Sequence, residues 1–142
     1  MTLLNLEKSR WRNYARPHHH DIPLLNVIDL VLGSRATAFS FEGANPRHEH
    51  EWRVFEEVAL PDDKLIIPGV IDSTSNFIEH PRTVADRIIR FAKVVGRERV
   101  IAGTDCGFST FAGRPNVHPS LVWPKLPALE EGARLASAEL WG

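Results

Sequence analysis

The sequence predicts an α/β fold in which parallel strands alternate with helices, and two observations support this prediction. Three short apolar segments with the composition of buried strands end at Glu42, Asp72 and Asp105-Cys106, and segments with helical periodicity separate them. The strand ends at 42, 72 and 106 are 30 and 34 residues apart. A (β/α)8 barrel of about 250 residues averages roughly 31 residues per βα unit, so the spacing fits a barrel. A doubly wound open sheet would give a similar order of elements.

The first half of the chain predicts a helix, a strand and a second helix. An apolar stripe indicates a helix over residues 22–32, with Asp21 as its N-cap and Gly33 as its C-cap. Residues 36–41 form an apolar run that predicts a strand. The pattern of aromatic and apolar residues over 48–58 predicts the next helix.

The middle of the chain contains the second predicted strand and the clearest helix. Residues 65–71 are mostly apolar, and Pro68-Gly69 within them predicts a bulge or an irregular strand. Residues 81–95 place their apolar side chains on a single helical face, and Gly96 is expected to end that helix.

The last third of the chain predicts one more strand and one more helix. Residues 99–104 form the third strand, which leads into Asp105-Cys106. A long loop is expected from 107 to about 118. The final helix is predicted over 128–140, entered through Pro124 and Pro127 because proline is disfavoured in a helix interior.

Composition restricts the function classes. The 142 residues suffice for one domain, and the hydrophobic share of 43% and charged share of 25% are those of a globular protein. A net charge of -1 gives no electrostatic reason to expect a nucleic acid or an anionic membrane as partner. No strand is followed by a Gly-rich phosphate loop. A single cysteine excludes an internal disulfide and predicts a cytoplasmic protein.

The strand ends carry the candidate functional residues. Right-handed βα connections would place Glu42, Asp72 and Cys106 at one edge of the sheet. A carboxylate and a thiolate at that edge can share a zinc ion, which accepts oxygen, nitrogen and sulfur ligands. The alternatives are a loop carboxylate at Glu42 and a small core residue at Cys106. Asp72 would either orient a substrate or cap the turn that follows it.

The histidines are a second set of candidates. His80 directly precedes the helix predicted over 81–95 and is expected to be a residue of the helix start. His48 and His50 are two residues apart, so in a helix they would point to different faces. The histidines that could line a pocket are His18, His19, His20, His48 and His50.

Several motifs together resemble the carboxyl-terminal part of the cobalamin-independent methionine synthase family. The motifs are Phe39-Ser40-Phe41-Glu42, Pro68-Gly69-Val70-Ile71-Asp72, Val84-Ala85-Asp86-Arg87-Ile88, Thr104-Asp105-Cys106-Gly107 and the segment 123–136. The runs Asn13-Tyr14, Pro17-His18-His19-His20-Asp21 and 45–51 are similar to a subgroup of short single-barrel relatives. That subgroup includes proteins similar to epoxyalkane:coenzyme M transferase. The resemblance covers about residues 11 to 137.

The resemblance implies a partial (β/α)8 barrel. This chain would supply about the last three to four βα units, and it would therefore be a truncated form of the family's barrel. Residues 1–16 are expected to be a divergent N-terminal segment, and residues 17–142 to be the C-terminal part of the barrel domain.

The resemblance also implies a chemistry, which is zinc-dependent transfer of a methyl or alkyl group to a thiol. Glu42 matches the family's carboxylate ligand and Cys106 its late cysteine ligand. The family's His-x-Cys ligand pair falls on Lys8 and Arg10, which cannot bind zinc in their charged state. A further family histidine falls near Thr74.

Two functions follow from this incomplete ligand set. The first is a methyltransferase of methionine biosynthesis, or a similar enzyme, that acts on homocysteine or a related thiol and is impaired in the isolated chain. The second is a non-catalytic remnant or interaction module. For the first, the partners would be a small thiol and an alkyl donor. In either case a second copy or another chain would cover the open barrel edges, and neither nucleic acid nor a membrane is expected.

Overall fold

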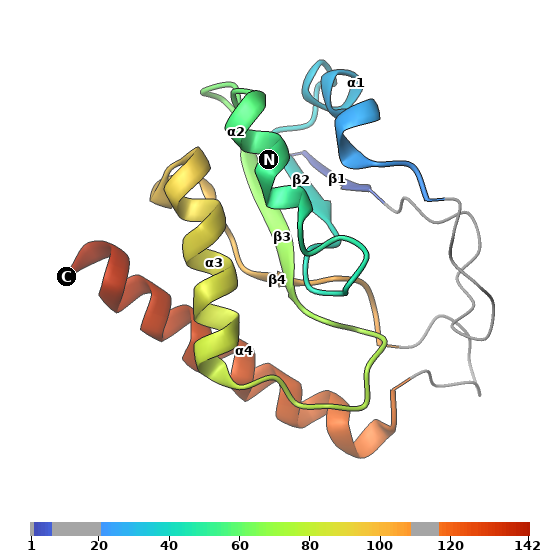
Figure 1. Ribbon diagram of the computed structural model, residues 1–142, viewed down its shortest axis with the longest axis vertical. Coiled ribbons are helices and arrows are strands. Elements are labelled where there is room, and N and C mark those ends of the chain that lie inside the picture. Colours follow the sequence, from blue (N-terminus) through green and yellow to red (C-terminus); the bar gives the residue numbers. More distant parts are fainter. Residues whose placement is uncertain (1, 7–20, 109–116) are drawn as a thin grey trace.

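A computed structural model describes residues 2–6, 21–108 and 117–142 and shows one parallel sheet flanked by helices (Figure 1). The strand order is β1-β2-β3-β4, and all neighbouring strands are parallel. The predicted α/β fold with parallel strands is confirmed. The strands are β1 (Leu3–Leu6), β2 (Ala38–Phe41), β3 (Leu65–Ile71) and β4 (Gly103–Thr104).

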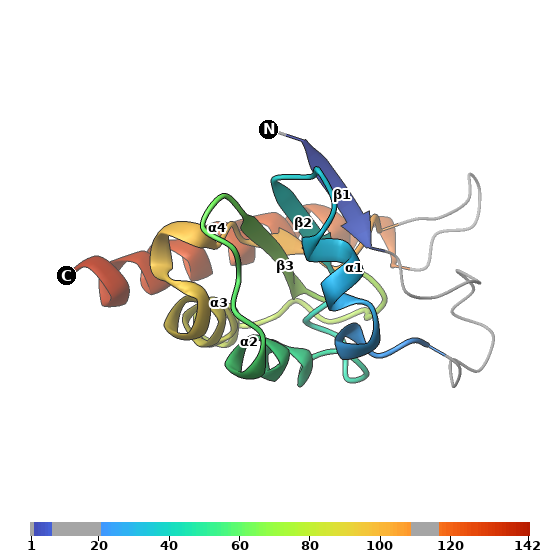
Figure 2. The same cartoon turned by 90° about the horizontal axis from the view of Figure 1, so that it is seen from above.

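The helices α1, α2 and α3 lie along one face of the sheet, as the view from above shows (Figure 2). The long C-terminal helix α4 packs against α3. Among the described residues, no helix is both long and apolar enough to cross a membrane. The helical elements are η1 (Leu24–Asn26), α1 (Ile28–Leu32), η2 (Glu51–Arg53), α2 (Val54–Glu57), α3 (Pro81–Val95), η3 (Arg97–Arg99) and α4 (Pro119–Trp141).

The sheet has a strand that the sequence patterns did not predict. Strand β1 pairs with β2 from Leu3 opposite Ala38 to Leu6 opposite Phe41. Leu4 packs against a small buried cluster that includes Phe39. The four residues of β1 are too few to show a periodic pattern, so the strand is recognised only from its pairing with β2. Residues 7–20, where the predicted segment boundary falls, lie outside the described part of the chain.

The prediction of one continuous helix over 22–32 is wrong. A 3₁₀ turn and the short helix α1 replace it, because the backbone leaves helical geometry at Val27, where φ is −125°. Asp21 does not cap this segment. The Leu24 N–H instead donates to Glu51 Oε1 at 2.7 Å, so a carboxylate distant in sequence accepts the hydrogen bond of this free backbone donor. Gly33 does end α1, as predicted.

The predicted helix over 48–58 is shorter than expected. The amides of His48 and Glu49 both donate to the carbonyl of Asn45, which makes a turn before η2 and α2. Phe55, in α2, is buried.

The predicted final helix is wrong at its start. Helix α4 begins at Pro119, where His118 accepts a hydrogen bond from the Ser120 amide, so Pro124 and Pro127 lie inside the helix rather than before it. Both prolines are exposed. Each proline removes one backbone donor, and the packing of α4 against α3 keeps the helix continuous.

The middle of the chain follows the prediction closely. Helix α3 spans 81–95, His80 caps it by accepting from the Arg82 amide, and Gly96 ends it at a φ of 98°. The predicted irregularity in β3 appears as a shift in its pairing with β4 between Gly69 and Ile71. Strand β4 is shorter than predicted, although residue 100 makes one isolated bridge to β3.

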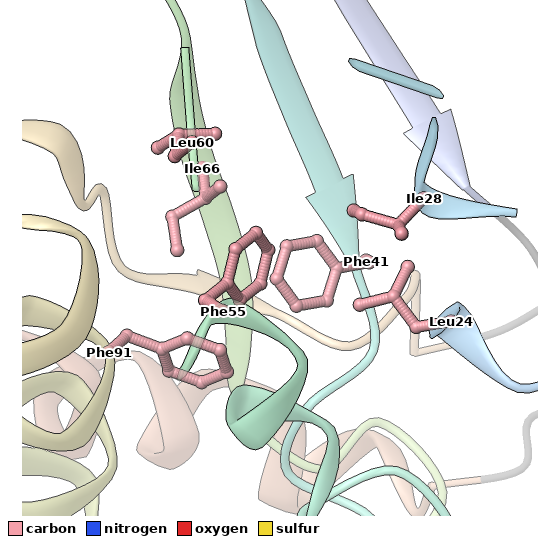
Figure 3. Packing of buried hydrophobic residues seen from close by; sticks show 7 residues of the cluster. All are labelled: Leu24, Ile28, Phe41, Phe55, Leu60, Ile66 and Phe91. Carbon is pink, nitrogen blue, oxygen red and sulfur yellow. The ribbon is translucent and has the colours of Figure 1, made fainter. Parts of the chain in front are cut away.

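A cluster of aromatic and aliphatic side chains fixes the strands against the helices (Figure 3). The rings of Phe41 and Phe91 have centroids 5.8 Å apart in an edge-on arrangement, and those of Phe41 and Phe55 are 5.9 Å apart. Phe41 directly precedes Glu42, so this packing anchors the start of the loop that carries the candidate site. The cluster consists of Leu24, Ile28, Phe41, Phe55, Leu60, Ile66 and Phe91.

Candidate metal centre

The structure brings together the side chains of Glu42 and Cys106. Glu42 follows β2 and Cys106 follows β4, and β3 lies between these two strands. The Cys106 thiol donates to Glu42 Oε1 at 3.2 Å. The expected meeting of the two side chains at one sheet edge is therefore observed, and their role as metal ligands stays a prediction.

The two carboxylate oxygens of Glu42 have different partners. Oε1 accepts the hydrogen bond from Cys106. Oε2 lies 3.2 Å from Asn45 Nδ2 and 3.2 Å from His48 Nε2. The side chain is thus held from one oxygen while the other faces the thiol, an arrangement suited to a carboxylate that binds a metal through a single oxygen.

Asp105 joins the two loops that carry this pair. Its carboxylate is 3% exposed and accepts from the amides of Gly43 and Ala44, both at 2.8 Å. It also accepts from the amide and the side-chain Nδ2 of Asn45, both at 2.9 Å. Burial raises the pKa of the Asp105 carboxyl, and the hydrogen bonds from Gly43, Ala44 and Asn45 oppose that rise.

A glycine in β3 makes room for the Asp105 side chain. A Cβ on Gly69 would lie 2.0 Å from Asp105 Oδ1 and 2.6 Å from Asp105 Cα. No side chain fits at that separation. The carboxylate of Asp105 therefore passes over β3 at a position that only glycine permits.

His48 is the histidine that the structure places at the site. It is 4% exposed, and its Nδ1 lies 3.1 Å from Glu51 Oε2 while its Nε2 contacts Glu42. Asp21 Oδ2 is 3.7 Å from the same Nε2. His50 is exposed. The candidates at 18–20 lie outside the described residues.

Asp72 serves the turn after β3. Its Oδ1 accepts from the Thr74 amide at 2.8 Å and from the Thr74 hydroxyl at 2.7 Å. The Lys125 ammonium, which is 0% exposed, bonds to the Asp72 carbonyl at 3.1 Å and to Glu79 Oε2 at 2.9 Å. Of the two predicted roles for Asp72, these contacts support the capping role.

The pair Glu42 and Cys106 fits zinc in chemistry and spacing. At usual Zn–O and Zn–S lengths of about 2.1 and 2.3 Å, two tetrahedral ligand atoms lie roughly 3.6 Å apart. The observed 3.2 Å between Oε1 and Sγ is close to that separation. No set of three or more His, Cys, Asp or Glu side chains that could hold a metal occurs among the described residues. Lys8 and Arg10 lie outside them.

The sequence patterns did not predict Asn45, Asp105 or Glu51 as part of the site. Asp105 directly precedes Cys106, and Asn45 follows Glu42 by three residues, so proximity in sequence was the available signal. Nothing in the sequence showed that these two side chains would bond to one another across 60 residues.

The chain is similar in sequence and in structure to known proteins. The chain is 34% identical over 117 residues to 2-hydroxypropyl-CoM lyase from Xanthobacter autotrophicus, a match that covers 81% of this chain and 30% of that protein. It is also similar to the structure of a B12-independent methionine synthase from Shewanella sp. W3-18-1 in complex with selenomethionine. That match has a TM-score of 0.67 and 25% identity. No protein-family model matches the chain.

The two matches confirm the resemblance that implied a partial (β/α)8 barrel. The structural match covers 81% of this chain and 30% of the methionine synthase. The chain thus spans about a third of the length of each relative. Its four parallel strands and helices correspond to part of the methionine synthase barrel, as the resemblance implied.

Proposed function

We propose that this chain, which is related to 2-hydroxypropyl-CoM lyase and to B12-independent methionine synthase, contributes Glu42 and Cys106 to a zinc centre for alkyl transfer to a thiol. The single observation that carries the proposal is the 3.2 Å contact between Glu42 Oε1 and Cys106 Sγ. The two residues are 64 positions apart in sequence, and both are of types that bind zinc. Their side chains are in contact in a fold that is similar to part of the methionine synthase structure.

The residues around the pair suit the binding of a cation. A thiolate and a carboxylate this close would repel each other without a positive charge between them, and in the absence of a metal the thiol proton occupies that place. Asn45 and His48 fix Oε2 of Glu42, so Oε1 needs little rearrangement to bind a metal.

In alkyl transfer, the sulfur of the acceptor thiol forms a bond to the alkyl carbon. The bond between that carbon and the donor breaks, and its electron pair stays on the donor. Bound zinc would supply Lewis acidity that keeps a thiol deprotonated near neutral pH. The contribution of this chain is to hold Glu42 and Cys106 as ligands; we propose a small thiol such as homocysteine as the acceptor.

Zinc affinity tests this proposal. Competition against a chromophoric chelator should give a binding constant for the unaltered protein that falls at least about tenfold in Cys106→Ala and in Glu42→Gln. Glu57→Gln is the matched control, because Glu57 is an exposed carboxylate on α2. Equal zinc affinity in all four proteins, or no zinc binding by the unaltered protein, would refute the zinc centre.

The edges of the sheet favour a second function, that of an interaction module. Among the described residues β1 pairs only with β2, and β4 only with β3. Open parallel edges tend to pair with other chains. We propose that a second copy covers them. Sedimentation velocity should then show a dimer at micromolar concentration, and a monomer at all concentrations tested would exclude this arrangement.

A further inference from the structure

We propose that Asp105 and Asn45 are positioning residues whose hydrogen bonds set the separation between Glu42 and Cys106. This inference rests on the proposed function, in which that pair binds zinc. Neither residue would touch the metal. Both would act through the two ligands beside them.

Asp105 is placed in the chain so that it connects the loop after β2 to the end of β4. Glu42 directly precedes Gly43, whose amide donates to Asp105 Oδ1 at 2.8 Å. Cys106 directly follows Asp105. One hydrogen-bonded junction therefore connects the residue after one ligand to the residue before the other. A shift of the loop after β2 relative to the end of β4 must break this junction.

The junction uses several backbone donors. Three successive amides, from Gly43, Ala44 and Asn45, converge on the two oxygens of Asp105. Three donors on a buried carboxylate fix the loop in translation and in rotation, whereas a single hydrogen bond would leave it free to pivot. The backbone of residues 43–45 is therefore held as one unit.

The side chain of Asn45 bridges the carboxylates of Asp105 and Glu42. Its Nδ2 donates to Asp105 Oδ2 at 2.9 Å and to Glu42 Oε2 at 3.2 Å. Both hydrogens of that amide group can therefore be used, one for each carboxylate. The bridge links the junction directly to the Glu42 side chain and leaves Oε1 directed at Cys106.

Two glycines leave room for the junction. Gly69 in β3 has no side chain where the Asp105 carboxylate passes. A Cβ on Gly43 would lie 3.0 Å from the Gly69 carbonyl and 3.4 Å from the Phe91 ring. The two glycines let the β2 loop, β3 and the β4 end approach closely enough for the hydrogen bonds to form.

The test uses the S–H stretching band of the metal-free full chain, in which Cys106 is the single cysteine. The hydrogen bond to Glu42 lowers that frequency, and Glu42→Ala supplies the reference without this acceptor. We expect Asn45→Ala and Asp105→Asn to move the band toward that reference. Asn45→Ala keeps all three backbone donors, so it tests the idea if Asp105→Asn does not fold.

The matched control is Asn76→Ala, which removes a loop asparagine whose side-chain oxygen accepts from the His118 amide. It should leave the band unchanged. A band in Asn45→Ala that coincides with that of the unaltered protein would overturn the positioning role. A shift of equal size in Asn76→Ala would also overturn it, because the effect would then not be local.

Cobalt binding separates this inference from the proposed function. The thiolate-to-cobalt charge-transfer band should appear in the unaltered protein, and the cobalt affinity of Asn45→Ala should be about tenfold lower. Failure of the unaltered protein to bind cobalt would refute the zinc centre, and the S–H band would still decide the positioning role. Tight cobalt binding with unchanged affinity and S–H band in Asn45→Ala would refute the positioning alone.

Discussion

At the scale of single residues, Glu42 shows how a short stretch of sequence acquires a directed side chain. Its backbone is fixed by Phe41, which lies in the aromatic cluster, and by the amides of the next three residues, which bond to Asp105. Its side chain has one oxygen held by Asn45 and His48 and the other in contact with Cys106. The site therefore depends on residues that are not themselves proposed as metal ligands.

Replacement of Gly69 should disturb both the fold and the site. In Gly69→Ala the new methyl group would overlap Asp105 Oδ1, so the carboxylate must move, at a cost of about 1–3 kcal/mol in unfolding free energy. Urea denaturation measures this cost. Gly33→Ala, at the end of α1, is the control and should change the free energy by less than about 1 kcal/mol. Equal stability of Gly69→Ala and the unaltered protein would contradict the packing described.

Removal of the buried ammonium of Lys125 should cost about 3–5 kcal/mol, because Glu79 would keep a charge without its partner. Lys125→Met is the variant, and denaturant unfolding is the measurement. The double variant Lys125→Met with Glu79→Gln should recover part of the loss, since it removes the orphaned charge. A double variant whose loss equals the sum of the two single losses would argue against direct pairing.

Residue types at strand ends made Glu42 and Cys106 predictable, whereas the junction between them was not. Strand periodicity and the right-handed βα rule are properties that a sequence displays directly. The hydrogen bonds that the amides of residues 43–45 donate to Asp105 depend on the register of three strands and on the room left by Gly69. Asp21 shows the same limit. Its position in the sequence predicted a helix cap, but the Leu24 N–H donates to the carboxylate of Glu51, which is distant in sequence.

At the scale of elements, α3 and α4 meet at a glycine. A Cβ on Gly132 would lie 2.5 Å from Val84 Cβ, so the two helix backbones are in close approach there. Gly132→Ala should lower the unfolding free energy by about 1–3 kcal/mol, because it forces the helices apart. Thermal or urea unfolding would measure the loss, and no loss would contradict the close approach.

The partner of this glycine can be tested by a double-mutant cycle. Val84→Ala should relieve part of the Gly132→Ala loss and give a coupling of at least about 0.5 kcal/mol. Val31→Ala is the control, because Val31 lies in α1 and packs in a different cluster, with Ala36 and Phe39. Its loss of unfolding free energy should add to that of Gly132→Ala. Coupling of equal size in both pairs would show that the effect is not specific to the α3–α4 contact.

Helix α3 was predictable in full because its apolar face, its cap at His80 and its stop at Gly96 all agree. Helix α4 was predicted too short because Pro124 and Pro127 are local breakers, and only the tertiary packing on α3 outweighs them. Strand β1 lacked any local signal. Local agreement between pattern, cap and stop thus decided which elements the sequence could predict.

At the scale of the whole molecule, the chain combines a packed α/β core with a site built from two strand ends. The two predicted metal ligands meet, and the described residues add no third. The chain spans 30% of the length of each relative. A zinc centre that uses this pair therefore needs further ligands from a substrate thiol, from water, from another chain, or from the part of this chain outside the described residues.

Zinc K-edge absorption of the zinc-loaded protein tests the central claim most directly, because it counts sulfur ligands and measures their distance. With no substrate thiol added, we expect one protein sulfur at about 2.3 Å, with the remaining ligands oxygen or nitrogen. That sulfur shell should disappear in Cys106→Ala and persist in the control Glu57→Gln. A zinc spectrum without sulfur in the unaltered protein, or one that Cys106→Ala leaves unchanged, would contradict the claim that Cys106 and Glu42 form a metal centre.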